Sequence, residues 1–117
     1  MTTSGERRVL TSGNFKEMPR IVCLCGSTRF WKTFQEASLK ETMEGRIVLS
    51  VGAATASDKD HGITPEQKIM LDELHKRKID LADEILVLNV GGYIGESTRS
   101  EIEYAKVLKM PIRYLEG

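Results

Sequence analysis

The chain has 117 residues, enough for one domain with one buried core, and its 17 Lys and Arg residues balance its 17 Asp and Glu residues. A net charge of zero argues against a general electrostatic nucleic-acid binder, whose affinity comes from neutralising phosphates. No stretch approaches the roughly 20 apolar residues of a membrane helix, and residues 1–19 lack the apolar segment of a signal peptide. We therefore expect a cytoplasmic protein with neither a nucleic acid nor a membrane as its partner.

The chain divides into two regions. Residues 1–18 are expected to form a flexible leader, with a short additional strand at Arg8–Thr11 as an alternative for part of it, and residues 19–117 a single domain. The run "RIVCLCG" (20–26) is short, apolar and ended by glycine. That pattern predicts a buried parallel strand.

Two cysteines, Cys23 and Cys25, lie two residues apart in this strand. Side chains at that spacing share one face of an extended strand. Two thiols with no Cys or His beside them in the sequence make a poor zinc site. We expect buried free thiols in a reducing compartment, with no metal and no cofactor.

A helix is predicted over 27–45, with Ser27 or Thr28 as its cap and Gly45 at its end. The side chains expected on its buried face repeat at helical spacing: Phe30, Phe34, Ala37 and the stem of Glu41. Trp31 at its start is assigned to the core in preference to base stacking.

A second strand is predicted over 46–52, followed by a small, polar loop over 53–62 in which His61 is a candidate ligand contact. The next helix, 64–83, has the clearest start signal, because Thr64, Pro65 and Gln67 form a capping box with proline at the first position. Its expected buried residues are Ile69, Met70, Leu74, Ile79 and Leu81.

A third strand (84–90), a helix (97–109) and a last short strand (111–116) complete the alternation. This order predicts a three-layer α/β fold, flavodoxin- or Rossmann-like, with a mostly parallel sheet of about four to five strands. Ligands in such sheets bind beyond the carboxyl ends of the strands. Glycine, hydroxyl and charged residues gather at all three of these places: 25–30, 52–62 and 89–98.

The first of these segments contains "GSTR" at a strand-to-helix turn. Gly26 would let the backbone approach a ligand, the Ser27 hydroxyl and free helix N–H groups would hold an anion, and Arg29 would bind a phosphate or carboxylate. The alternative is a Ser-capped helix with a solvated Arg. The segment lacks the glycine spacing and the lysine of a P-loop.

The segment "GGYIGESTRSE" (91–101) also leads into a helix, but it is not the dinucleotide fingerprint. Its candidate substrate-binding residues are Gly91, Gly92, Tyr93, Gly95, Ser97 and Thr98, with Tyr93 as the stacking side chain. Two interpretations of Glu101 stay open. Thr98 and Glu101 are spaced as a capping box, or Glu101 is a rigidly held carboxylate whose ionised form the helix dipole favours.

The helix at 64–83 carries further candidates. Asp72 and His75 share one face of it, and Asp80 and Asp83 lie near its end. Each of these residues is more often an ordinary surface side chain, and Asp83 is expected to orient the turn into the third strand.

Three segments, "VCLCGSTRF", "HKRKIDLADEILVLN" and "ESTRSEIEYAKVLKMPI", together resemble the nucleoside 2-deoxyribosyltransferase superfamily, which includes the 2'-deoxynucleoside 5'-phosphate N-hydrolases. The resemblance covers roughly residues 20–115. It implies that Glu101 attacks C1' of a (deoxy)ribosyl group and expels the base, as a retaining glycosidase does. Asp72 and His75 are then the further catalytic candidates, and a nucleoside or nucleotide is the substrate. The family also implies a homodimer, to which Leu39, Met43, Val107 and Leu108 would contribute unless they are core residues.

The sequence departs from the family pattern where His75 stands for an acidic residue and Glu103 for a glycine. These departures motivate an alternative, a non-catalytic nucleotide-binding protein of the same fold. A third interpretation is a phosphoribohydrolase of the cytokinin-activating type. The segment "VGGYIGESTRSE" loosely resembles the proline- and glycine-rich loop of those enzymes.

Overall fold

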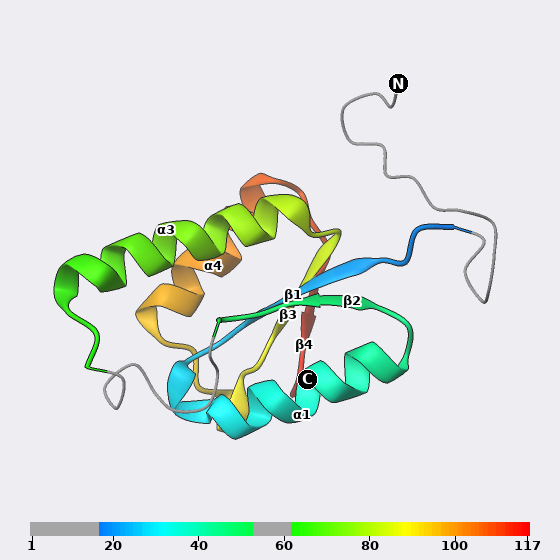
Figure 1. The fold of residues 1–117 in the computed structure, drawn as a ribbon, viewed down its shortest axis with the longest axis horizontal. Helices are drawn as coiled ribbons and strands as arrows, with labels where there is room; N and C mark the ends of the chain where they lie inside the picture. The colour runs from blue at the N-terminus through cyan, green and yellow to red at the C-terminus, as the bar shows by residue number, and fades with distance from the viewer. Residues whose placement is uncertain (1–16, 53–61) are drawn as a thin grey trace.

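A computed structural model describes residues 17–52 and 62–117 (Figure 1). Four strands form one parallel sheet in the order β2-β1-β3-β4. Their bounds are β1 (Ile21–Cys25), β2 (Ile47–Leu49), β3 (Glu84–Val87) and β4 (Ile112–Tyr114). The predicted α/β fold with a parallel sheet is confirmed, while the alternative strand at Arg8–Thr11 and most of the proposed leader lie outside the described residues.

Helices cover both faces of the sheet (Figure 1). Helix α1 (Trp31–Met43) lies on one face, and α3 (Pro65–Leu81) and α4 (Glu96–Val107) pack together on the other. Two short 3₁₀ turns, η1 (Thr28–Phe30) and η2 (Val90–Gly92), follow β1 and β3. The predicted three layers are therefore present.

Alternate residues of β1 divide the core between these two faces, as strand geometry requires. Val22 and Leu24 pack on the α1 side, where the buried partners are Phe34, Ala37, Leu86 and Leu88. Cys23 and Cys25 pack on the α3–α4 side, where the buried partners are Ile79, Ile85, Val87, Ile102 and Ala105. The prediction that the two thiols share one buried face is confirmed.

The strand order places a topological switch point between β1 and β3. The connection from β1 leads outward to β2, and the connection from β3 leads outward to β4 on the other side. The turns that leave β1 and β3 therefore diverge at the carboxyl edge of the sheet, which is where ligands bind in open α/β sheets.

Two of the local signals predicted at helix ends are confirmed. The Thr64 hydroxyl accepts from the Gln67 N–H at 3.2 Å, and the Gln67 side chain accepts from the Thr64 N–H at 2.9 Å, so the capping box is complete. Gly45 has φ of 86° just after α1, a left-handed conformation that favours glycine.

The buried stripe predicted for α3 is confirmed at Ile79 and wrong at its other four residues. Ile69, Met70, Leu74 and Leu81 are between 45% and 71% exposed, whereas His75 and Ile79 are buried. The side of α3 that carries His75 and Ile79 faces the sheet, because α3 packs against β1 as well as against α4. The more apolar face of α3 is left on the surface.

A chain of ion pairs closes the amino-terminal edge of the sheet. Glu84 is 6% exposed, and its two oxygens accept from Arg20 at 2.7 Å and from Arg113 at 2.6 Å. Arg113 also donates to Glu41, which is 1% exposed. Burial by itself raises the pKa of Glu84, but the two arginine hydrogen bonds outweigh it, so that the pKa is lowered.

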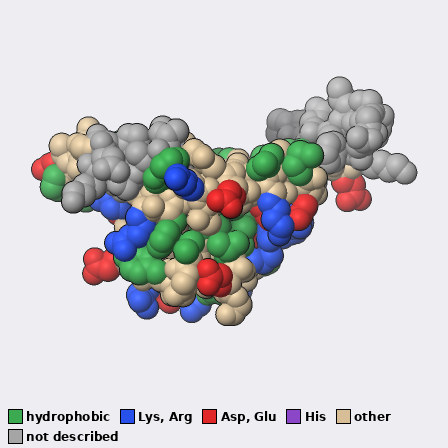
Figure 2. Space-filling view, turned by 90° about the horizontal axis from the view of Figure 1, so that it is seen from below, with side chains coloured by type: hydrophobic (Ala, Val, Ile, Leu, Met, Phe, Trp, Pro, Cys, Tyr) green, Lys and Arg blue, Asp and Glu red, His purple; other side chains and the backbone are tan. Residues whose placement is uncertain are grey.

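The predicted role of Asp83 in the turn before β3 is supported by its contact, because its carboxylate accepts the N–H of Ile21 at 2.8 Å. The surface carries exposed apolar side chains on α1 and at the C-terminal end of α4, including Leu39, Met43, Val107 and Leu108. Their alternative assignment to the core is therefore wrong. Figure 2 shows hydrophobic side chains gathered on the face seen from below, among charged ones.

Among the helices described in residues 17–52 and 62–117, none has the length and apolar character needed to cross a bilayer.

Candidate functional site

A pocket of about 430 Å³ opens at the carboxyl edge of the sheet, on the α3–α4 side of the switch point. It lies between the turn after β1, the segment before α4, and the facing sides of α3 and α4. Most of the predicted site residues line it: Gly26, Ser27, Asp72, His75, Tyr93, Gly95, Ser97, Thr98 and Glu101. The structure thus brings together candidates that are up to 75 positions apart in the chain.

Glu101 lines this pocket and is only 7% exposed. The predicted capping box between Thr98 and Glu101 is wrong, because α4 begins earlier, with Gly95 at the N-cap and no side-chain cap. Thr98 is consequently an interior helix residue, 3% exposed. Glu101 lies one turn further along the same buried face, where its carboxylate reaches the cavity.

Burial raises the pKa of Glu101 to about 7, with the nearby His75 charge opposing this and Cys23 reinforcing it. Burial therefore acts against the ionised form of this carboxylate, which the helix dipole was expected to favour. The His75 Nε2 lies 4.0 Å from Glu101 Oε1. A buried carboxyl whose pKa lies near neutral pH is typical of functional sites.

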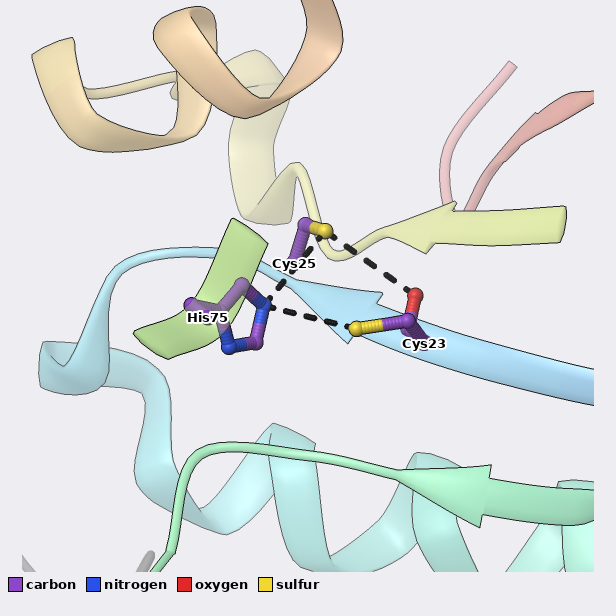
Figure 3. A group of neighbouring side chains, drawn as sticks. All are labelled: Cys23, Cys25 and His75. Atoms are coloured by element: carbon purple, nitrogen blue, oxygen red, sulfur yellow. Dashed lines mark hydrogen bonds between the residues drawn. The ribbon is translucent and has the colours of Figure 1, made fainter. Parts of the chain in front are cut away.

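His75 contacts both cysteines (Figure 3). Its Nε2 lies 3.5 Å from Cys23 Sγ and 3.6 Å from Cys25 Sγ. The expectation of two thiols without a histidine partner is wrong, because α3 crosses the face of β1 to which both thiols point. Sequence spacing holds no signal for this contact, since 50 or more residues separate the partners.

The cluster has unusual acid–base properties. The hydrogen bond with Cys25 lowers the pKa of Cys23 to about 6, although burial opposes this and His75 assists it. The same hydrogen bond, together with burial, raises the pKa of Cys25. Burial favours neutral His75, but the contact with Cys23 and the charge of Glu101 outweigh it and raise the pKa of the imidazole.

Asp72, one of the predicted acids, belongs to a hydrogen-bonded group on the pocket wall. Lys68 Nζ donates to Asp72 at 2.9 Å and to Ser97 Oγ at 3.1 Å, and Ser97 Oγ lies 3.4 Å from the second Asp72 oxygen. Sequence reasoning missed Lys68. The signal was present, because Lys68 and Asp72 are four apart on one helix face.

The turn after β1 contributes only part of what was expected. Gly26 and Ser27 line the pocket, with the Ser27 hydroxyl accepting the Arg29 N–H at 3.4 Å. The Arg29 side chain is absent from the lining, and its guanidinium lies 4.4 Å from the centre of the Tyr93 ring. Trp31 also lines the pocket, so that its assignment to the core is wrong.

Gly91 and Gly92 also fall outside the pocket lining. Both have positive φ, 62° and 81°, and form the tight turn η2. The Gly91 N–H donates to the Glu116 carboxylate at 2.9 Å. These two glycines therefore shape the turn after β3 and tie it to the chain beyond β4.

Among the remaining candidates, His61 lies outside the described residues. Asp80 pairs with Arg77 and accepts from Tyr104 on the outer side of α3 and α4, as a surface residue does.

Neither a family model, nor a curated protein, nor a solved structure matches the chain significantly.

Proposed function

We propose that the protein cleaves or transfers the N-glycosidic bond of a (deoxy)nucleoside or its 5'-monophosphate, with Glu101 as the nucleophile. The observation that carries the proposal is the position of Glu101, a buried carboxyl facing a pocket at the switch point of the sheet. Hydroxyl, lysine and aromatic side chains around it suit a sugar, an anion and a base: Ser27, Trp31, Lys68, Tyr93 and Ser97.

In the proposed reaction the ionised Glu101 attacks C1' as the bond from C1' to the base nitrogen breaks. The electron pair of that bond leaves with the base, which takes up a proton from solvent, and the sugar is held as an ester of Glu101. Water, or a second base, then attacks C1' and gives a proton to solvent, while the bond from C1' to the Glu101 oxygen breaks and returns the free carboxylate. Asp72 is the residue proposed to contact the base, and His75 to position the Glu101 carboxylate.

The test incubates the protein with a panel of deoxynucleosides, ribonucleosides and their 5'-monophosphates and measures free base. Glu101→Gln removes the nucleophile and is expected to lower base release at least about 100-fold. Glu96→Gln is the matched control, because Glu96 lies in the same helix and lines the same pocket but is exposed. Equal release by wild type and Glu101→Gln would remove Glu101 from the mechanism.

A second candidate is a nucleotide-binding protein without turnover. The observation that favours it is the pKa of about 7 at Glu101, since a partly protonated carboxyl is a weak nucleophile but a good hydrogen-bond donor. Thermal shifts with the same panel separate the candidates. Ligand at about 100 times its Kd stabilises the folded state by roughly 2.7 kcal/mol, so stabilisation without base release supports the binder.

The compartment proposed for this activity is the reducing cytoplasm. Its support is that both cysteines of the chain are buried and free of a disulfide. Fractionation of cells that express the full chain tests the location.

A further inference from the structure

Three metal-ligating atoms converge beneath the proposed substrate pocket (Figure 3). They are Cys23 Sγ, Cys25 Sγ and His75 Nε2, and each lies within 4.8 Å of the others. The two cysteines project from one face of β1, and α3 brings the imidazole over them. All three residues are buried, with exposed fractions of 5% or less, so their ligand atoms are held by packing on two rigid elements.

The separations match those of ligands that share one tetrahedral ion. Zinc binds cysteine sulfur at about 2.3 Å and histidine nitrogen at about 2.0–2.1 Å, so a tetrahedral angle places S and N about 3.6 Å apart. The two S–N separations in this chain are 3.5 and 3.6 Å. An ion would therefore fit among these atoms with little movement of the side chains.

We propose that Cys23, Cys25 and His75 form a binding site for Zn²⁺, with the carboxylate of Glu101 as the fourth ligand. Glu101 Oε1 lies 4.0 Å from His75 Nε2, on the pocket side of the cluster. Closing that distance by about half an ångström gives the spacing of nitrogen and oxygen ligands on one zinc ion. The ligand set of two sulfurs, one imidazole and one carboxylate favours zinc over Mg²⁺ or Ca²⁺, which take oxygen ligands.

Metal binding changes the protonation of the cluster in a defined way. Both cysteines bind as thiolates and His75 binds as the neutral imidazole through Nε2, and the protons that these groups carry in the metal-free protein go to solvent. No electron is transferred. The two thiolates balance the charge of the ion, and the carboxylate of Glu101, which binds ionised, gives the site a net charge of −1.

This inference rests on ligand geometry and not on the proposed glycosidase activity. The two are nevertheless linked through one atom group, since a Glu101 carboxylate bound to zinc cannot attack C1'. Zinc loading is therefore expected to abolish base release, and a chelator to restore it. Metal uptake and base release are measured separately, so that failure of one does not decide the other.

The direct test is titration of the reduced, metal-free full-length protein with Co²⁺, which replaces zinc and absorbs light. Thiolate-to-cobalt charge transfer in the near ultraviolet, saturating at about one ion per chain and lost when Zn²⁺ is added, is the expected result. The chain has only two cysteines, so that this band has no other source.

Two variants with one control complete the test. Cys23→Ser and His75→Gln are expected to weaken cobalt binding at least about 100-fold. His61→Gln replaces the only other histidine and is expected to leave binding unchanged. If Cys23→Ser does not fold, His75→Gln alone carries the comparison, with circular dichroism to check its fold. Absence of the charge-transfer band in the wild type, or a band that His75→Gln leaves intact, would overturn the proposal.

Discussion

The Glu101 carboxylate on α4 lies 4.0 Å from the His75 imidazole on α3, and both side chains are less than 10% exposed. The two helices pack against each other over the α3–α4 face of the sheet, so the pair is held by the fold and not by a mobile loop. This pair joins the open pocket to the buried thiols below it. The burial of this pair affects both the stability and the chemistry of the protein.

Glu101 is expected to lower stability at neutral pH. Its pKa rises from 4.5 to about 7 on folding, so that between these values the folded state holds more protons than the unfolded state. Stability from this group is therefore lost as pH rises from about 4.5 to about 7. Glu101→Gln should match wild type near pH 4 and exceed it by up to about 3 kcal/mol at pH 8, measured by urea unfolding.

The matched control for this prediction is Glu103→Gln on the same helix, because Glu103 is exposed and its ion pair with Lys106 joins two exposed side chains. The stability of Glu103→Gln should depend on pH in the same way as the stability of the wild type. A Glu101→Gln profile that runs parallel to wild type from pH 4 to pH 8 would show that the buried carboxyl carries no such cost.

Arg113 is expected to be essential for stability, because it donates to two buried carboxylates, Glu84 and Glu41. Arg113→Met removes a shared partner from both and should lower the free energy of unfolding by about 3 kcal/mol or more. Arg77→Met removes a half-exposed arginine with ion pairs to Glu73 and Asp80, and should cost less than about 1 kcal/mol. Similar losses for the two variants in urea unfolding would contradict this account of the network.

Gly26 is expected to tolerate no side chain. A Cβ at this position would lie 3.1 Å from the Leu88 Cβ and 3.3 Å from the Leu88 carbonyl oxygen. Gly26→Ala should therefore destabilise the protein by about 1–3 kcal/mol, as thermal unfolding would show. Gly52→Ala, at another pocket glycine with no atom within 4 Å of the added Cβ, should change stability little, and an equal loss there would refute the steric explanation.

Self-association is predicted from the exposed apolar face of α3. Met70 and Leu81 are 54% and 64% exposed and, unlike Leu74 in the same helix, do not line the pocket. Sedimentation of the wild type is expected to give a dimer, because burying such side chains against a second copy removes them from water. The double variant Met70→Glu and Leu81→Glu should sediment as a monomer, and a wild type that is already monomeric would contradict the prediction.

Sequence patterns predicted the parts of the fold that depend on neighbouring residues. The apolar runs at β1 and β3, the capping box at Thr64 and the glycine ending α1 were all found. Patterns failed where distant elements decide the outcome. The burial of His75 instead of Leu74 depends on how α3 lies across β1, and periodicity within one helix does not specify that direction.

The same division holds for the candidate site. Glu101, Asp72 and His75 were chosen from the sequence, and all three line one pocket. The environment of Glu101 was not predicted, because its raised pKa comes from burial by elements far away in the chain. The contact between His75 and the two cysteines was missed for the same reason.

Covalent trapping tests the proposed role of Glu101 as a nucleophile most directly. A 2'-fluoro-substituted deoxynucleoside destabilises the oxocarbenium-like transition state and slows hydrolysis of the ester intermediate. Intact mass of the metal-free protein is expected to rise by one fluorosugar per chain, with the adduct on the peptide that contains Glu101, and Glu101→Gln is expected to remain unlabelled. An adduct on another residue, or base release from the normal substrate by Glu101→Gln at the wild-type rate, would contradict the account.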